Sequence, residues 1–305
     1  MRIKKLQEFE VSVFFVRRAE RNLKEGKVNS YYRYRSAMRA FEEFAGGKIS
    51  LKDVTREWLE ECETHFREKG LSYTSINIYM KALKAVMNEI NPNGKFPFGK
   101  GKYEIPSSSP RKLALTKDQI RKLINFKGTS IEEKYRDLWL FSYLCNGINF
   151  RDLLFLKYSD IENGEICFIR AKTKQKNSHP RIIRAVITQE MQDIMVRLGN
   201  GAYGAPDAYI FPFATPRMTP MEMCHLVRRI TNSCNRSLRN IAIKLRIPPF
   251  TTYSARHSFA TILQRSGVEI DYISECLGHS NLEITRVYLA GFDKSTRMKN
   301  ARKLL

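Results

Sequence analysis

The chain has 305 residues, 43% of them hydrophobic, and a formal net charge of +22 at pH 7. This length suggests two domains, and the apolar content is sufficient for real cores. The excess of Lys and Arg favours a polyanionic partner and argues against an acidic protein or a small neutral molecule as the main ligand.

The six cysteines form no C-x-x-C pair and have no accompanying histidine spacing, so the sequence indicates neither a zinc site nor a disulfide framework. No apolar run is long enough to span a bilayer, and the first residues lack the apolar core of a signal peptide. We therefore expect a cytoplasmic protein, associated with the nucleoid through DNA and not with a membrane.

Residues 1–105 are predicted to form an all-helical domain. Apolar residues at helical spacing, with caps and glycine stops, indicate helices over about 30–44, 56–69 and 74–90. Such helices carry an apolar stripe and basic side chains elsewhere, which suits a bundle that lies on phosphates. The candidate DNA contacts here are Arg33, Arg35, Lys81 and Lys84. A simple solvated face explains any single lysine equally well.

A linker follows over residues 97–115, where prolines, glycines and a run of serines break the periodicity. We place the domain boundary near Pro106, so that the second domain covers residues 106–305. Its first two helices are predicted to begin at caps formed by Thr116 and Ser130.

A short helix over 153–156 and an Asn163-Gly164 turn come next. Together with strands predicted over 167–170 and 181–187, the turn indicates a small antiparallel sheet at the edge of a helical domain. The predicted fold class is therefore mainly α with a small antiparallel β-sheet.

Three features mark the segment from Thr251 to Tyr288. Arg256 lies in the first turn of a helix that begins at Ser254, where it would sit beside free backbone N–H groups and could hold an anion. A second helix ends at Gly278, so His279 is fixed in a tight turn. A capping box at Ser280 then starts a helix that carries Tyr288.

Arg256-His257, Leu277-Gly278-His279 and a tyrosine nine residues later, Tyr288, together resemble the C-terminal signature of the tyrosine recombinases, the phage integrase family. The family pattern is His-x-x-Arg-His, then Leu-Gly-His, then a nucleophilic tyrosine. The resemblance implies a helical core-binding domain followed by an α+β catalytic domain with a C-terminal tail helix. It implies a site-specific recombinase that needs no cofactor and no metal.

The resemblance also implies roles for individual residues. Tyr288 attacks phosphorus to form a 3′-phosphotyrosyl bond, Arg256 and His279 hold phosphoryl oxygens, and a lysine acts as the general acid toward the 5′-oxygen. Lys172 takes the register of that β-hairpin lysine, at the start of a basic loop over 171–177. Further DNA contacts are expected from Lys174 and Lys176.

The chain departs from the family pattern at two positions. Asn149 stands in the register of the first catalytic arginine, and Tyr253 stands at the first histidine of His-x-x-Arg. A phenol can still position a phosphate oxygen but cannot provide an imidazolium. As a substitute for the missing arginine we consider Arg151 first, although it would need non-helical backbone, and Arg136 second.

An integrase or invertase of a mobile or invertible element is the favoured hypothesis, with double-stranded DNA as the partner. A catalytically silent DNA-binding protein on the same scaffold and a type IB topoisomerase are the alternatives. The resemblance further implies a tetramer on two DNA sites, coupled through the tail after Gly291, and accessory DNA-bending proteins as further partners.

Overall fold

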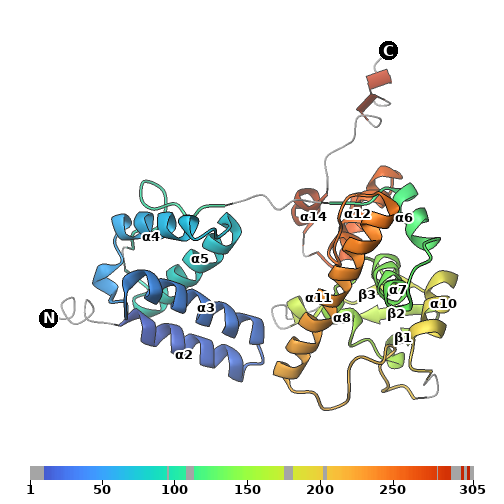
Figure 1. Cartoon of the computed structure of the whole chain (residues 1–305), viewed down its shortest axis with the longest axis horizontal. Helices are drawn as coiled ribbons and strands as arrows, with labels where there is room; N and C mark the ends of the chain where they lie inside the picture. Colours follow the sequence, from blue (N-terminus) through green and yellow to red (C-terminus); the bar gives the residue numbers. More distant parts are fainter. Residues whose placement is uncertain are drawn as a thin grey trace. The chain divides into compact units, whose positions relative to one another are not determined.

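The chain divides into two compact units, Met1–Pro110 and Arg111–Leu305, each with its own hydrophobic core. The computed structural model describes residues 10–94, 96–107, 113–174, 181–201, 205–279, 281–289, 297–298 and 301–302. Most of these residues are helical, and the strands form a single three-stranded antiparallel sheet (Figure 1). The predicted fold class is confirmed.

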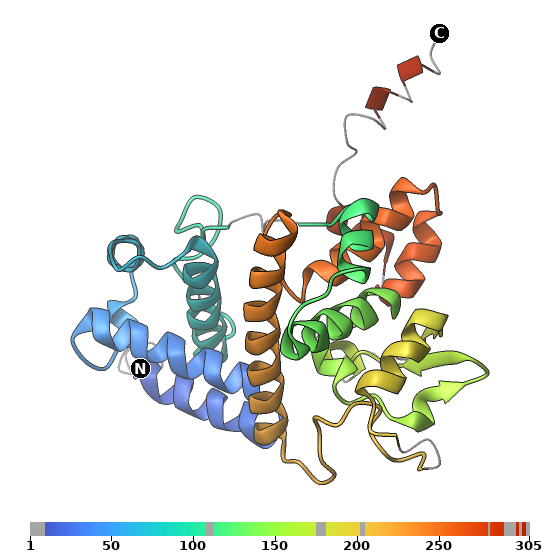
Figure 2. The same cartoon turned by 45° about the vertical axis from the view of Figure 1, so that its right-hand side comes forward.

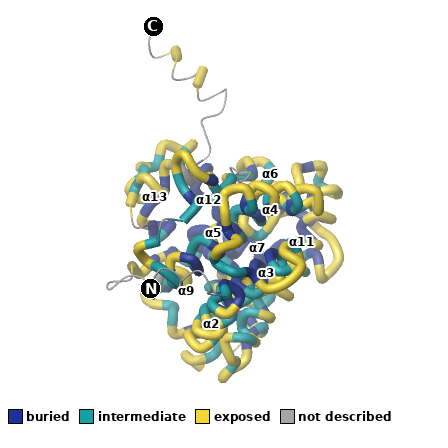
Figure 3. Tube along the Cα trace, turned by 90° about the vertical axis from the view of Figure 1, so that its left-hand side faces the viewer, coloured by how far each residue is buried: buried dark blue, intermediate teal, exposed yellow. Residues whose placement is uncertain are grey.

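The first unit is built from helices. These are α2 (Val11–Lys24), α3 (Val28–Ala45), α4 (Arg56–Glu68) and α5 (Tyr73–Ile90), with a short 3₁₀ turn, η1, at Leu51–Asp53. The last three α-helices match the prediction, and Thr55 caps α4 by accepting a hydrogen bond from the N–H of Trp58 at 3.1 Å. Buried residues alternate with exposed ones along these helices, as Figure 3 shows.

Helix α2 was not predicted from the sequence. Its buried residues Val11, Phe15 and Ala19 recur every four positions and pack on the core of this unit. However, the helix follows Glu10, which makes no side-chain capping bond. Without a capping side chain the start of the helix carries no local signal.

The second unit contains α6 to α14 and the sheet. Its elements are α6 (Lys117–Ile124), α7 (Ser130–Leu144), α8 (Phe150–Leu153), η2 (Tyr158–Asp160), α9 (Ala171–Lys174), α10 (Gln189–Leu198), α11 (Pro220–Leu245), α12 (Ser254–Arg265), α13 (Ile270–Leu277) and α14 (Leu282–Tyr288). The central element is α7, whose Trp139 and Phe141 are fully buried while α10, α11 and α12 pack around it. In the described part of the chain, no helix is both long enough and apolar enough to cross a membrane.

The sheet has the order β1-β2-β3, with β1 at Ile161–Glu162, β2 at Glu165–Phe168 and β3 at Ile183–Val186. The predicted Asn163-Gly164 turn joins β1 to β2, and both turn residues have positive φ, 50° and 78°. β2 ends two residues earlier than predicted. The basic segment that follows begins as helix α9 and not as a hairpin loop.

Two predicted caps are displaced by one residue. Thr129, not Ser130, caps α7 by accepting from the N–H of Glu132 at 3.3 Å. Asn281 caps α14 by accepting from the N–H of Ile284 at 3.0 Å, and the predicted cap Ser280 lies outside the described residues. The short helix predicted over 153–156 is α8, which starts three residues earlier.

Candidate active site

The last three helices bring the C-terminal motif residues together. Ala260 of α12, Ile273 and Leu277 of α13, and Leu289 after α14 form a small separate core that joins these helices. Trp139 of α7 fixes the start of α12, because its indole N–H donates to the carbonyl of Thr251 at 3.0 Å. The site is thus built on packed helices.

Arg256 lies in the first turn of α12, as predicted, but it is only 3% exposed. Its guanidinium donates to two backbone carbonyls, that of Gly147 at 3.3 Å and that of Leu277. Gly147 has a φ of +63°, and a Cβ there would lie 2.5 Å from the Cα of Arg256, so only glycine lets the loop after α7 approach α12. The arginine is therefore held by two neighbouring turns and does not lie on the surface.

His279 follows Gly278, which ends α13 in the left-handed conformation at φ 60°. The histidine is 6% exposed, with Nε2 3.4 Å from Nη2 of Arg256 and Nδ1 2.8 Å from the hydroxyl of Thr285. Because arginine only donates, Nε2 accepts, so Nδ1 carries the proton and donates to Thr285. Burial and the charges of Arg256 and Arg170 lower the pKa of His279 to about 4. Its imidazole is neutral at pH 7.

Tyr288 is the last residue of α14, and its side chain lies outside what the structure describes. The helix that carries it is fixed on both sides of the tyrosine. Thr285, one turn earlier, is fully buried and bonded to His279, and Leu289, the next residue, is buried in the small core. The backbone on both sides of Tyr288 is thereby fixed, with the preceding turn bonded to His279.

Lys172 lies on α9, and its side chain is exposed. The N–H of Ala171, its neighbour, donates to Oδ1 of Asp152 on α8 at 3.0 Å, which ties α9 to α8. The side chain of Lys174 and the whole of Lys176 lie outside the described residues.

The phage integrase family matches residues 114–294, which is more than half of the chain, and the phage integrase SAM-like domain matches residues 10–91. The chain belongs to the phage integrase family. The tyrosine recombinase of Pseudothermotoga lettingae is 28% identical over 260 residues, which cover 81% of each chain. The tyrosine recombinase XerA of Pyrococcus furiosus is 28% identical over 230 residues, covering 73% of this chain and 71% of the relative.

Solved structures of integrases share the fold. A Tn1549 transposon integrase in complex with a circular intermediate DNA matches with a TM-score of 0.66 at 20% identity, covering 98% of this chain and all of that chain. A lambda integrase dimer bound to a COC′ core site matches with a TM-score of 0.62 at 16% identity, covering 96% and 82% of the two chains.

The first arginine of the family pattern is replaced here by Asn149, which forms the N-cap of α8 and is half-buried. Arg151 does not take its place, because it lies in helical backbone and is exposed. It lines an open cavity of about 500 Å³ with Phe155 and Tyr209, and neither Arg256 nor His279 lines that cavity.

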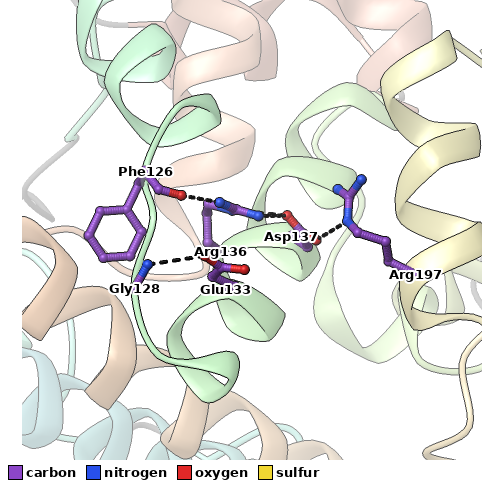
Figure 4. A network of polar contacts seen from close by, with 6 residues as sticks. All are labelled: Phe126, Gly128, Glu133, Arg136, Asp137 and Arg197. Atoms are coloured by element: carbon purple, nitrogen blue, oxygen red, sulfur yellow. Dashed lines mark hydrogen bonds and ion pairs between the residues drawn. The ribbon is translucent and has the colours of Figure 1, made fainter.

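Arg136, the second substitute considered, is also excluded by its contacts (Figure 4). It is 5% exposed and donates to the carbonyl of Phe126 and to Oδ1 of Asp137. Asp137 also accepts from Nε of Arg197 at 2.9 Å, so this network joins the loop before α7 to α10. Arg136 therefore stabilises the fold and does not reach the site.

Tyr253, at the position of the family's first histidine, is the N-cap residue of α12 and is 54% exposed. Its ring packs edge-on against the ring of the buried His257, with 4.9 Å between centroids. The phenol thus stands at the exposed start of the helix that carries Arg256.

The candidate DNA contacts of the first unit differ in environment. Arg33 and Lys81 are exposed, whereas Arg35 and Lys84 are half-buried. The guanidinium of Arg33 lies 5.1 Å from the ring of Tyr34, and the ammonium of Lys84 lies 5.9 Å from the ring of Phe98.

Two residues that contact this cluster, Thr285 and Arg170, were not predicted from the sequence. Arg170 follows β2, is half-buried, and donates from Nη1 to the carbonyl of Leu277 at 3.3 Å. The one local sign that Arg170 lies near the site was its position two residues before Lys172. Its contact with Leu277 joins positions that are 107 residues apart in the sequence.

Proposed function

We propose that this tyrosine recombinase, a DNA strand-transferring enzyme, cleaves its DNA site with Tyr288, holds the scissile phosphate with Arg256 and uses the neutral imidazole of His279 as the acceptor of the phenolic proton. The observation that supports these roles best is the joint placement of Arg256, His279 and Thr285, one turn before Tyr288 on a buried helix. The side chains of Arg256, His279 and Thr285 meet at the turn that follows α13.

The chemistry follows from what each group can donate or accept. The phenolic oxygen of Tyr288 forms a bond to phosphorus while the bond from phosphorus to the 5′-oxygen breaks, so one phosphoester replaces another. Arg256 donates to the nonbridging oxygens, where negative charge grows. Lys172 gives a proton to the departing 5′-oxygen.

The phenolic proton needs an acceptor, because a tyrosine with a pKa of about 10 is ionised only about one part in a thousand at pH 7. Guanidinium groups stay protonated, whereas the neutral imidazole of His279 has a lone pair on Nε2. A bound phosphate offsets the charge of Arg256, which raises the pKa of His279 and makes it a better acceptor. A second 5′-hydroxyl then attacks the phosphotyrosine: its oxygen bonds to phosphorus as the bond to Tyr288 breaks, its proton passes to Lys172, and His279 returns a proton to the phenolic oxygen.

DNA contact in the second unit is assigned to the exposed side of α11, the long orange helix of Figure 2. This helix has 26 residues, of which only Glu222 is acidic. One side of it is exposed and polar at helical spacing, over His225, Arg229, Asn232, Arg236 and Arg239. We call these five residues the basic face of α11. A helix with such a face suits contact with phosphates and base edges.

The Tn1549 and lambda integrases were solved with DNA, which supports double-stranded DNA as the partner. Integration, excision or inversion of a mobile element is the reaction we propose, on two DNA sites held by a tetramer, with DNA-bending proteins as accessory partners. Phosphotyrosine chemistry also allows relaxation of supercoils, but the comparisons give recombinases and favour strand exchange.

Tyr288→Phe tests the proposal. Duplexes are first selected from a randomised pool for binding to the protein, then nicked so that the cleaved fragment diffuses away. We expect the wild-type protein to form a denaturation-resistant adduct with such DNA, and Tyr288→Phe to form none because the attacking oxygen is absent. The readout is a protein–DNA band in a denaturing gel.

Binding of the intact duplex serves as the control, because Tyr288→Phe should bind it as the wild-type protein does. Tight binding without any adduct from the wild-type protein would identify a catalytically silent DNA-binding protein instead.

A further inference from the structure

The site built above lacks one cationic group. Asn149 offers an amide where the family pattern has an arginine, and neither Arg151 nor Arg136 reaches the other site residues. A charged donor that is lost from a phosphoryl-transfer site typically costs a few kcal/mol of transition-state stabilisation. Among the described residues, two arginines besides Arg256 contact the turn at His279, namely Arg170 and Arg181.

Arg170 shares a hydrogen-bond acceptor with Arg256. Its Nη1 donates to the carbonyl of Leu277 at 3.3 Å, and Nη2 of Arg256 donates to the same oxygen. The Arg170 side chain passes along the turn before His279, since a Cβ at Gly278 would lie 3.4 Å from its Cδ. Two guanidinium groups thus converge beside one imidazole.

Positive charge is concentrated beside His279, because the charges of both Arg170 and Arg256 act on its ring. The carboxylate of Asp152 accepts from the N–H of Ala171 at 3.0 Å and lies within the electrostatic influence of both Arg170 and Arg256. Burial raises the pKa of Asp152, although the N–H of Ala171 and the charge of Arg170 oppose this rise. The charges of Arg256 and Arg170 both disfavour protonation of His279. An anion bound here would reduce the repulsion between the two guanidinium groups.

Arg181 is the other arginine that contacts this turn. Its Nη1 donates to the carbonyl of His279 at 2.9 Å, but the residue is exposed and does not share the acceptor of Arg256. It contacts the turn in the same manner as Arg170, through a backbone carbonyl. This makes Arg181 a matched control for a purely structural arginine.

We propose that Arg170 is the second phosphate-binding arginine of this site and replaces, from the end of β2, the arginine missing at Asn149. The assignment rests on the proposed function. Arg170 neither gives nor takes a proton; it donates hydrogen bonds to a nonbridging oxygen of the scissile phosphate and offsets the charge that grows there. The bond that forms joins the phenolic oxygen of Tyr288 to phosphorus, and the bond that breaks joins phosphorus to the 5′-oxygen.

The test measures the rate of adduct formation on the selected nicked duplex. We expect Arg170→Ala to lower this rate by about 100-fold or more, as loss of one such donor does. Arg181→Ala should change it far less. Adding Asn149→Arg to Arg170→Ala should restore much of the rate, because it returns a guanidinium at the family position.

A methylphosphonate at the scissile position separates a phosphate contact from a structural role. This linkage has a methyl group in place of one charged oxygen, so Arg170 loses its partner. We expect wild type and Arg170→Ala to cleave it at similar rates. The inference is overturned if Arg170→Ala keeps the wild-type rate on ordinary DNA, or if its defect is equally large on both linkages. If the wild-type protein itself forms no adduct, the proposed function fails, and this inference fails with it.

Discussion

At the scale of single residues, the site depends on a histidine that stays neutral. His279 is held from both sides, by Arg256 at Nε2 and by the hydroxyl of Thr285 at Nδ1. A cationic ring would have to donate toward an arginine that has no acceptor. In the protein without DNA, the same contacts that position the ring therefore also disfavour its protonated form.

This arrangement makes the stability of the fold depend on pH. The folded pKa of His279, about 4, lies below the ordinary value of 6.5, so between these values the unfolded chain binds a proton that the folded chain does not. The free energy of unfolding should fall as pH drops from 6.5 toward 4, by at most about 1.4 kcal/mol per pH unit. Denaturant titrations at several pH values, compared with His279→Gln, isolate this contribution. Parallel pH profiles for the two proteins would contradict it.

The helix start at Arg256 and the turn at His279 were predicted from the sequence because local residues define both helix ends. Thr285 and Arg170 were not predicted, because what makes them part of the site is contact across the fold. Arg170 reaches Leu277, and Thr285 reaches His279 only after α14 has packed on α13. No spacing rule relates such positions.

At the scale of elements, a helix start was predicted correctly where the sequence offers one suitable capping residue. Where two neighbouring residues could cap the helix, the wrong one was predicted. Thr116 stands alone and caps α6 as expected. Before α7, Thr129 and Ser130 are both suitable, and each has a glutamate three residues later. Thr129 is the residue that caps the helix. Glu132, its partner in the capping box, also forms an ion pair with Lys244 of α11 at 2.6 Å. A tertiary ion pair thus accompanies the cap that is used.

The long helix α11 was not predicted, although it carries the basic face assigned to DNA. Arg229 and Arg236 of that face are exposed, and within the described part of the chain neither forms an ion pair. We expect Arg229→Ala or Arg236→Ala to lower the slope of log affinity against log salt by roughly one, because each removes one phosphate contact. Titrations of labelled duplex at several salt concentrations give the slope.

Arg121→Ala is the matched control for these variants. Its guanidinium already pairs with Asp118 at 2.8 Å, so its removal should leave the slope unchanged. Equal effects of all three substitutions would show that only net charge matters and that α11 has no special part in binding.

At the scale of the whole molecule, each unit has the means to fold alone. Residues 1–110 have a core of their own around Phe15, Phe41 and Leu83, and the core of residues 111–305 surrounds α7. Both units are basic, since residues 1–110 contain 21 Lys and Arg against 14 Asp and Glu out of a net charge of +22. DNA binding is therefore expected to use both.

Expressed separately, residues 1–110 and 111–305 should each unfold in one cooperative transition in denaturant. Each should bind duplex DNA more weakly than the whole chain, because linkage makes the second contact intramolecular. Circular dichroism and gel-shift titrations measure the two properties. A fragment 111–305 that binds as tightly as the whole chain would assign no affinity to the first unit.

The burial of Thr285 and Leu289 finally indicates which protomer supplies the tyrosine that cleaves each strand. To reach a phosphate held by a neighbour, the end of α14 would have to give up the Thr285–His279 bond and expose Leu289 to water. Both contacts are made within one chain. We therefore expect catalysis in cis, in which the tyrosine of each protomer cleaves the strand whose scissile phosphate is bound by the arginines of the same protomer.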